Sequence, residues 1–215
     1  MQTKLHSRPD LLLLLSLLLV ILLSPAMDHS DWRRAVLAAL TFIPVVLSTV
    51  MLWQMRVWVW PSILLMLGGL IFLVASNIFH SQALDGIRWG FLAAFFALAA
   101  VGLFSYLRNS HLITQAHLFT AINIYLLLGM LWAAIYSAMG AFHPGSIQLG
   151  SHPTDRQSEL LYFSLTTLST IGYGDVLPVS GETRMLAALE GVTGVLYIAI
   201  TVAILVSRFG RELSD

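Results

Sequence analysis

The chain of 215 residues contains no cysteine. Disulfides, thiolate metal sites and cysteine nucleophiles are therefore excluded from any account of its function. Charge is also scarce, because 10% of the residues are charged while 58% are hydrophobic. Water-soluble domains carry about 25% charged and about 45–50% apolar residues. The composition therefore predicts an integral, multi-pass membrane protein in contact with lipids.

Basic clusters are missing as well. No basic run exceeds Arg33-Arg34, and the formal net charge is zero. A nucleic-acid partner would need a basic patch, so none is expected. The sequence also offers no grouping of a nucleophile, a base and an orienting residue. We therefore expect no enzymatic activity, no catalytic residues and no organic cofactor.

Six apolar segments are long enough, or nearly so, for the roughly 20 residues of a membrane-spanning helix. They cover residues 11–27, 35–53, 57–78, 87–107, 118–139 and 183–207. Six spans place both termini on one side of the membrane. The basic residues divide almost evenly between the two sides, so the positive-inside rule does not fix the orientation. Small size and a minimal C-terminus favour a bacterial inner (plasma) membrane with both termini cytoplasmic.

The first segment allows two interpretations. Lys4 and Arg8 precede a leucine-rich run, and Ser24-Pro25-Ala26 follows it. This pattern fits a cleaved signal peptide as well as a retained helix. We favour the retained helix, because a polytopic protein needs no cleaved signal. Either alternative leaves the arrangement of the other helices unchanged.

The stretch between the fifth and sixth segments, residues 140–182, is unusual. It begins with loop-forming residues and becomes apolar again over residues 160–168, a run too short to span a bilayer. The run predicts a re-entrant half-helix, for which Thr154 and Gln157 would form the capping box. Backbone that leaves a helix at membrane depth is tolerated only inside protein or beside water. An aqueous path is therefore expected here.

The half-helix is followed by the string Thr170-Ile171-Gly172-Tyr173-Gly174-Asp175. A dehydrated potassium ion needs a cage of oxygens, which backbone carbonyls supply if consecutive ones point the same way. Such a ribbon needs unusual dihedral angles at alternate positions, and Gly172 and Gly174 can adopt them at no steric cost. The string resembles the selectivity filter of the potassium channel family, a group of pore-loop cation channels. The resemblance covers residues 118–211.

The resemblance implies a function and an assembly. Potassium ions would bind at the oxygens of the filter residues Thr170, Ile171, Gly172, Tyr173 and Gly174. Tyr173 would point away from the ions and pack against the half-helix. One chain carries one motif, so the resemblance implies a homotetramer that conducts potassium passively down its gradient.

Several residues around the filter depart from the family pattern. Many members have two tryptophans in the pore helix, one of which donates a hydrogen bond to the filter aspartate, here Asp175. The matching positions are Tyr162 and Phe163, and Phe163 cannot donate. Thr166 stands where one bacterial group has a glutamate, so the resemblance does not tell how the filter of this chain inactivates.

Glu190 is the clearest ionisable residue inside a span, and such residues default to functional hypotheses. It could be protonated, or it could bond to pore-helix hydroxyls such as Thr166 or Thr167. We favour structural support of the filter over direct contact with ions. A role as a pH sensor is the alternative.

The last span carries two further features. Gly194 lies at the position that the family uses as a gating hinge, and Gly191 lies one turn earlier. Both could instead serve close helix packing, since small residues favour it in membranes. For Gly191 we favour packing, and for Gly194 both alternatives stay open. The family alignment also places Ile198, Val202 and Val206 along the pore cavity, although such a stripe could pack against neighbouring helices.

The first four spans lack the arginine repeat of a voltage sensor. Their arginines, Arg33, Arg34, Arg56, Arg88 and Arg108, all lie near helix ends. We therefore expect two regions, residues 1–117 as a four-helix region of unknown role and residues 118–215 as the pore domain. Only four residues follow Arg211, so no cytoplasmic ligand-binding domain is expected. The seven histidines lie in loops or near span ends, and we expect them at the surface.

Taken together, these patterns predict an all-α membrane protein with six transmembrane helices. A re-entrant pore helix and filter loop lie between the fifth and sixth helices, and four subunits form the pore. The alternative is a non-conducting regulatory subunit that joins other channel subunits. A transporter built around Glu190 is disfavoured, because transporters usually show broken helices in both halves.

Overall fold

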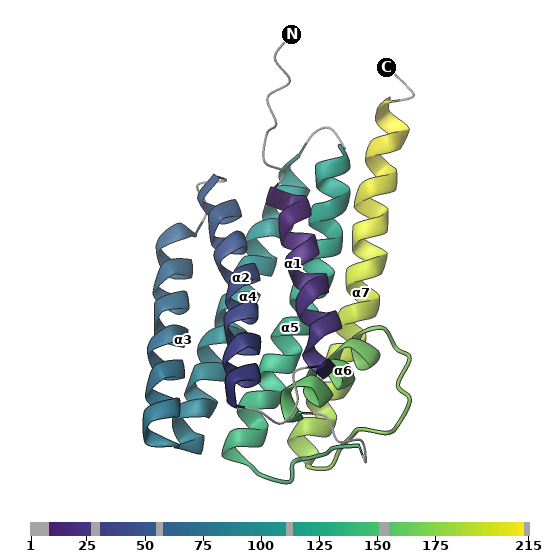
Figure 1. The fold of residues 1–215 in the computed structure, drawn as a ribbon. Helices are drawn as coiled ribbons and strands as arrows, with labels where there is room; N and C mark the ends of the chain where they lie inside the picture. Colours follow the sequence, from purple (N-terminus) through teal and green to yellow (C-terminus); the bar gives the residue numbers. More distant parts are fainter. Residues whose placement is uncertain (1–8, 27–30, 55–57, 111–113, 151–154, 213–215) are drawn as a thin grey trace.

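The computed structural model describes residues 9–26, 31–54, 58–110, 114–150 and 155–212. Within these residues the chain forms seven α-helices and two strands of two residues each (Figure 1). The helices are α1 (Pro9–Leu23), α2 (Asp31–Gln54), α3 (Val59–Phe79), α4 (Gln82–Asn109), α5 (Gln115–Phe142), α6 (Arg156–Leu168) and α7 (Gly181–Glu212). A 3₁₀ turn (Ser24–Ala26) extends α1, and the strands are β1 (Ile147–Gln148) and β2 (Leu177–Pro178). The expected all-α architecture is confirmed.

In the described part of the chain, four helices are long and apolar enough to cross a membrane, namely α3, α4, α5 and α7. The other two predicted spans correspond to shorter apolar helices, α1 and the Ala39–Gln54 part of α2. Figure 1 shows α1 to α5 running alternately up and down, with the ends of α1 and α7 that are nearest the termini on one side. The opposite end, where α6 begins and β1 and β2 lie, is called the α6 end below.

The core lies between α4 and α5, which pack along their length. Phe95, Leu103 and Leu127 are fully buried there. Where α2 crosses α4, Gly102 allows close approach, because a Cβ at this position would lie 2.5 Å from the Leu52 side chain. Small residues that permit such contact are typical of helix packing in membranes.

Helix α1 is an integral part of this bundle. Leu13 and Leu17 are fully buried against its neighbours. The Asn123 side-chain amide on α5 donates to the Asp10 carbonyl oxygen at 2.8 Å, and the Ser158 hydroxyl on α6 donates to the Ser24 carbonyl oxygen at 2.7 Å. These contacts cross the boundary that the sequence predicts between residues 117 and 118. The retained-helix interpretation of the first segment stays a prediction.

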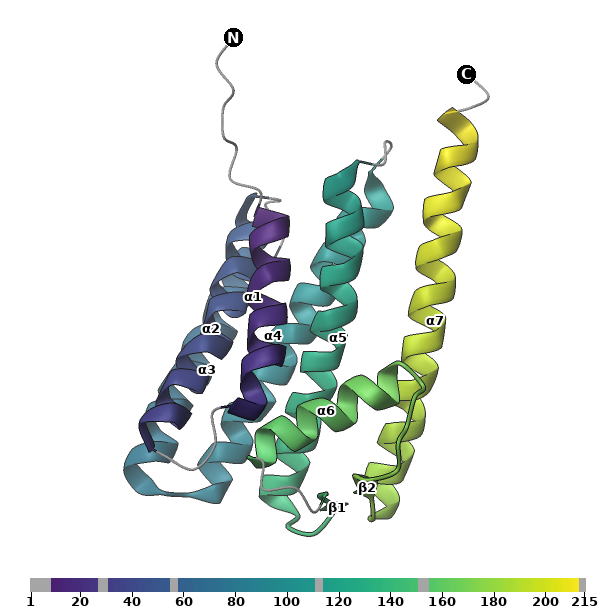
Figure 2. The same cartoon turned by 45° about the vertical axis from the view of Figure 1, so that its right-hand side comes forward.

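Figure 2 shows that α6 rises from the α6 end only to about the middle of α7, after which the chain returns to the same end. This is the expected re-entrant path. The cap of the half-helix differs from the prediction. Thr154 lies outside the described residues, and Asp155 is the N-cap, its carboxylate accepting from the Gln157 backbone N–H at 3.3 Å.

The segments before α6 and after the returning loop are joined at the α6 end. β1 and β2 pair antiparallel, with Ile147 opposite Pro178. The Ser146 carbonyl oxygen accepts from the Val179 backbone N–H at 2.9 Å and from the Thr183 hydroxyl at 2.9 Å. These bonds fix where α7 begins relative to α5.

Candidate functional site

The loop from residue 170 to residue 175 has an alternating backbone. Thr170, Gly172 and Gly174 have φ angles of 60°, 52° and 80°, whereas the residues between them do not adopt positive φ. Glycine adopts this left-handed region freely, but for threonine it is strained. Alternation of left-handed residues turns successive carbonyls toward one face, the arrangement that the sequence predicts for Gly172 and Gly174. Thr170 was not expected to share it.

The end of α6 supports this loop directly. The Thr166 carbonyl oxygen accepts from the backbone N–H groups of Ile171 at 2.9 Å and Gly172 at 3.2 Å. The Thr167 carbonyl oxygen accepts from the Thr170 N–H at 3.0 Å. The C-terminal end of a helix carries partial negative charge, which favours a cation nearby. The loop is therefore anchored to a helix end whose electrostatics suit a cation.

Asp175 is tethered despite Phe163. The Tyr162 hydroxyl donates to Asp175 Oδ2 at 2.8 Å. A tyrosine hydroxyl keeps its donor proton at neutral pH. Tyr162 also stacks on Tyr173, with ring centroids 6.3 Å apart and planes at 5°. Asp175 therefore does have a hydrogen-bond donor on α6, which is the hydroxyl of Tyr162.

Phe163 faces the other way, into the core. Its ring lies 5.0 Å from that of Tyr136 on α5. Phe163 is 6% exposed and Tyr136 is fully buried, so the two rings join α6 to α5. Phe163 therefore contributes packing rather than a hydrogen bond.

Glu190 is fully buried behind the pore helix. Its Oε2 accepts from the Tyr136 hydroxyl at 2.7 Å, and its Oε1 lies 2.6 Å from Ser164 Oγ. Ser164 Oγ also lies 2.8 Å from the Gly129 carbonyl oxygen on α5. Glu190 thus connects α7, α6 and α5, as a support role requires.

The α6 hydroxyl that bonds to Glu190 belongs to Ser164, and not to Thr166 or Thr167 as predicted. Thr166 Oγ1 bonds to the carbonyl oxygens of Tyr162 and Phe163, each at 3.0 Å, and the structure gives no bond from Thr167 to Glu190 among the described residues. Ser164 takes this place because it lies on the face of α6 that meets α5 and α7. The predicted partners are therefore corrected, while the type of group is right.

The two glycines of α7 differ. A Cβ on Gly194 would clash with the Leu168 carbonyl oxygen, whereas a Cβ on Gly191 would lie 3.8 Å from the Thr167 carbonyl oxygen. Helix α7 is continuous through both positions. The geometry thus favours close packing for Gly194 and leaves room for a methyl group at Gly191.

Ile198, Val202 and Val206 lie on the outer surface of α7 in the single chain, with exposed fractions of 51%, 51% and 63%. They share this exposure with a broad apolar face that includes Leu189, Val192, Val195 and Leu196. Their expected role along a pore cavity stays a prediction.

Three participants were missed by the sequence analysis: Ser164, Tyr136 and the left-handed Thr170. A buried glutamate between helices needs donors, so polar residues on the facing helices were a usable signal for Ser164 and Tyr136. Thr170 gave no such signal.

Comparison with known proteins identifies the region around this site. Residues 124–211 match the family model described as "Ion channel". The inward rectifier potassium channel Kirbac3.1 of Paramagnetospirillum magnetotacticum is 30% identical over 93 residues, which cover 41% of this chain and 28% of that channel.

Two eukaryotic relatives are similarly distant. Two pore potassium channel a of Oryza sativa is 32% identical over 107 residues, or 50% of this chain and 27% of the relative. The human voltage-gated potassium channel KCNC4 is 34% identical over 100 residues, or 45% of this chain and 16% of the relative. The alignments thus span less than a third of the length of each relative. No solved structure matches the chain significantly.

Proposed function

We propose, from the ion-channel pore domain that residues 124–211 carry, that four copies of this chain form a potassium-selective pore. The pore conducts potassium passively across the membrane in which the chain is embedded. An ion-channel domain is not an enzyme, and the proposal assigns no catalytic chemistry. Potassium is the transported substrate, and its sites lie at the oxygens of Thr170, Ile171, Gly172, Tyr173 and Gly174.

The observation that carries this proposal is the backbone alternation at Thr170, Gly172 and Gly174. Carbonyls that point to one side can replace the hydration shell of an ion. A tight turn without this function would not need three left-handed residues at every second position, one of them a strained threonine. The tether from Tyr162 to Asp175 holds the outer end of the loop in place.

The assembly follows from what one chain leaves open. Ile171 and Tyr173 are 57% and 70% exposed, and the apolar face of α7 has no cover among the described residues. One filter ribbon surrounds no ion, whereas rings of carbonyls from four chains do. Partner subunits would bury the α7 face and complete the ring.

The membrane arrangement completes the proposal. Counting α1 and α2 as spans gives six crossings, with α6 and the filter re-entering between the fifth and sixth. Both termini then lie on the side opposite the filter, which we take to be the cytoplasmic side of a bacterial inner membrane. Residues 118–215 act as the pore domain, and residues 1–117 form a helical collar around it.

Glu190 is assigned to structural support of the pore helix, as a neutral carboxylic acid. The hydroxyl of Ser164 has one proton and two oxygens within reach, those of Gly129 and Glu190. A protonated Glu190 donates to Ser164, which then donates to Gly129, while Tyr136 donates to the other carboxyl oxygen. If Glu190 were a carboxylate, the single proton of Ser164 would go to Glu190. Ser164 Oγ and the Gly129 carbonyl oxygen would then lie 2.8 Å apart without a proton between them.

The test is potassium flux into liposomes that contain the purified protein, with sodium as the control ion. Gly172→Ala is the inactive reference, because alanine at its φ of 52° is strained by roughly 1–2 kcal/mol in each subunit. Gly191→Ala is the matched control, because the same added methyl group would make only an ordinary contact, 3.8 Å from the Thr167 carbonyl oxygen. We expect potassium flux without sodium flux, lost in Gly172→Ala and kept in Gly191→Ala.

A non-conducting regulatory subunit is the second candidate. It would give no flux alone, across pH and voltage, and would alter the current of another channel chain on co-expression. Equal fluxes of sodium and potassium would contradict the proposed selectivity.

A further inference from the structure

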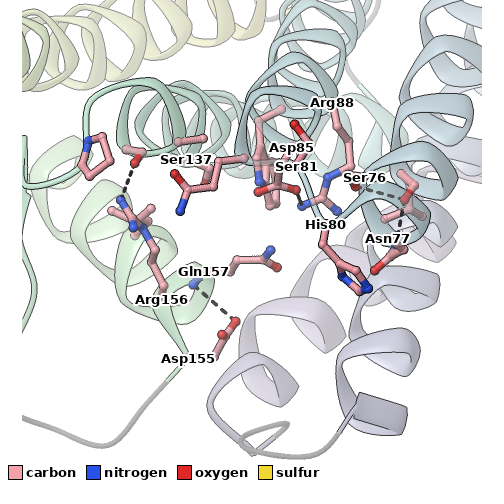
Figure 3. Close-up of a pocket in the computed structure, with 17 residues that line it drawn as sticks. Ser76, Asn77, His80, Ser81, Asp85, Arg88, Ser137, Asp155, Arg156 and Gln157 are labelled. Carbon is pink, nitrogen blue, oxygen red and sulfur yellow. Dashed lines mark hydrogen bonds and ion pairs between the residues drawn. The ribbon is translucent and has the colours of Figure 1, made fainter.

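A polar cavity of about 730 Å³ lies at the α6 end, between α3, α4, α5 and α6. Figure 3 shows Asp85 and Arg88 lining it from α4 and Arg156 and Gln157 from α6. The cavity is separate from the filter loop, none of whose residues line it. Its volume is typical of sites for small molecules, which occupy about 300–1,000 Å³.

Arg88 is the most unusual residue of the lining. It is 7% exposed, and its Nη2 pairs with Asp85 Oδ1 at 2.7 Å. Its guanidinium carbon lies 4.4 Å from the centre of the Trp89 ring. Its Nε is buried and has no hydrogen-bond partner in the described part of the chain. A buried donor without an acceptor costs about 1–3 kcal/mol, so an acceptor from outside the chain is expected.

The charges around the cavity leave a surplus of donors. Asp85 neutralises Arg88, and the Asp155 carboxylate is engaged at the N-cap of α6. Arg156 donates from Nη2 to the Gly140 carbonyl oxygen at 2.9 Å, and within the described residues it pairs with no carboxylate. The two arginines and two aspartates of the lining balance formally, so what remains for a ligand is a set of guanidinium N–H groups on Arg88 and Arg156. A negatively charged group with several oxygens fits this wall.

The position of the cavity suits a ligand at the membrane surface. Its walls include Ser76, Asn77 and His80 at the end of α3, a helix whose apolar side chains are largely exposed. Ends of spanning helices lie near the lipid headgroups. Guanidinium groups suit the oxygens of a phosphate headgroup. A water-soluble phosphate compound could reach the same place from the aqueous side.

We propose that this cavity binds the phosphate group of an anionic ligand, held between Arg88 on α4 and Arg156 at the start of α6. The ligand supplies an acceptor for Arg88 Nε and for the guanidinium N–H groups of Arg156 that the Gly140 carbonyl oxygen does not bind. It is either the headgroup of an anionic lipid or a soluble phosphate compound. In both cases it links the four-helix region to the helix that carries the filter.

Native mass spectrometry of the purified protein tests the proposal. The protein is exchanged into mixed micelles with either phosphatidylglycerol, which is anionic, or phosphatidylcholine, which has no net charge. A parallel series titrates glycerol phosphate and inorganic phosphate and follows the melting temperature. We expect retention of about one phosphatidylglycerol per subunit in preference to phosphatidylcholine, or a rise in melting temperature with a soluble phosphate. The first result identifies a lipid and the second a soluble ligand.

Two variants locate the site. Arg156→Gln removes one guanidinium group, and the pair Asp85→Asn with Arg88→Gln removes the partly exposed ion pair without leaving a lone charge. Each is expected to weaken binding by about tenfold or more, the effect of one lost charge-assisted hydrogen bond. Arg108→Gln is the matched control, because Arg108 lies at the other end of α4. A melting curve and size-exclusion profile like those of the unaltered protein show that each variant is folded.

Three results would overturn the proposal. The first is equal retention of both lipids together with no response to soluble phosphates. The second is binding that folded Arg156→Gln and the double variant leave unchanged. The third is an equal loss of binding in Arg108→Gln, which would mean that general surface charge, not this cavity, attracts the ligand.

Discussion

Helices α3 and α7 expose similar amounts of apolar surface, in contrast to α4 and α5. In their most apolar stretches, 11% of α3 and 17% of α7 is buried, against 50% of α4 and 56% of α5. The surroundings of the two exposed helices differ. α3 contacts α2 and α4 and lies far from the filter loop, whereas α7 packs against α6, which leads into that loop.

The same exposure therefore has two explanations. The apolar face of α3 suits lipid chains. The apolar face of α7, on the proposed function, meets partner subunits and a water-filled cavity. The exposure of a helix within one chain does not distinguish a lipid-facing surface from a subunit-facing surface. The position of the helix relative to the filter does distinguish them. The following predictions test this distinction, from the largest expected effect to the smallest.

The largest effect is expected from single cysteines, which report cleanly because the chain has none of its own. Val202 and Val74 are matched, since each is a valine with 51% exposure, on α7 and α3 respectively. A water-soluble thiol reagent needs a thiolate, which forms in water and not in lipid. We expect Val202→Cys to react on the order of 100-fold faster than Val74→Cys. Modification of Val202→Cys should also abolish potassium flux. Equal rates at both positions would remove the distinction between the two helices.

The next effect concerns the contact between α7 and α6. Gly194→Ala places a methyl group against the Leu168 carbonyl oxygen, whereas Gly191→Ala adds one where there is room. Overpacking costs typically up to about 3 kcal/mol per site. We expect Gly194→Ala to lower the melting temperature of the assembly clearly and Gly191→Ala to leave it nearly unchanged. A stable Gly194→Ala variant with altered opening would favour the hinge instead.

A smaller difference in melting temperature is expected between two substitutions of Glu190. Glu190→Ala leaves the buried Tyr136 hydroxyl without its acceptor, at a cost of about 2 kcal/mol. Glu190→Gln keeps an acceptor for Tyr136 and a donor for Ser164, as a neutral acid does. Melting curves should therefore place Glu190→Gln near the unaltered protein and Glu190→Ala well below it. Equal destabilisation by both substitutions would argue for a carboxylate. Infrared spectra should show a protonated carboxyl band that is lost in Glu190→Gln.

The smallest effect is expected at the outer end of the filter. Tyr162→Phe keeps the ring that stacks on Tyr173 and removes the hydrogen bond to Asp175, worth about 1 kcal/mol. We expect normal assembly and stability, with potassium currents that decline faster during sustained opening. Tyr106→Phe is the matched control, because it removes a hydroxyl from a stacked ring on α4, outside the filter region. Currents in Tyr162→Phe that match those of the unaltered protein would show that Asp175 needs no tether.

The backbone of the loop over residues 170–175 was largely predictable from sequence, because its requirements are local. Gly172 and Gly174 reveal left-handed backbone without knowledge of the fold, and the apolar run before them predicts α6. The one-residue error at its cap has a similar local origin, since Thr154 and Asp155 are both good cap residues. Element boundaries are uncertain by such amounts.

Contacts between helices were harder to predict from the sequence. Glu190 was recognised as important, yet its partners Ser164 and Tyr136 depend on the rotation of α6 and α5 about their axes. Periodicity alone does not fix that rotation. His117 is a second example, because it was expected at the surface but is 8% exposed. It lies 2.6 Å from Ser110 Oγ and stacks on Tyr106, so the turn between α4 and α5 encloses it.

The cavity at the α6 end was missed for the same reason. Arg88 was noted only as an arginine near a helix end. Its burial, its pairing with Asp85 and the approach of Arg156 require three helices to be placed together. Charged residues on separate helices form a site only when the packing is known.

The most direct test of the central claim is the reversal potential of single channels in a planar bilayer with potassium on one side and sodium on the other. The proposed filter predicts discrete openings whose current reverses far toward the potassium equilibrium potential. Reversal near zero would mean that the pore does not distinguish the two ions and would contradict the account.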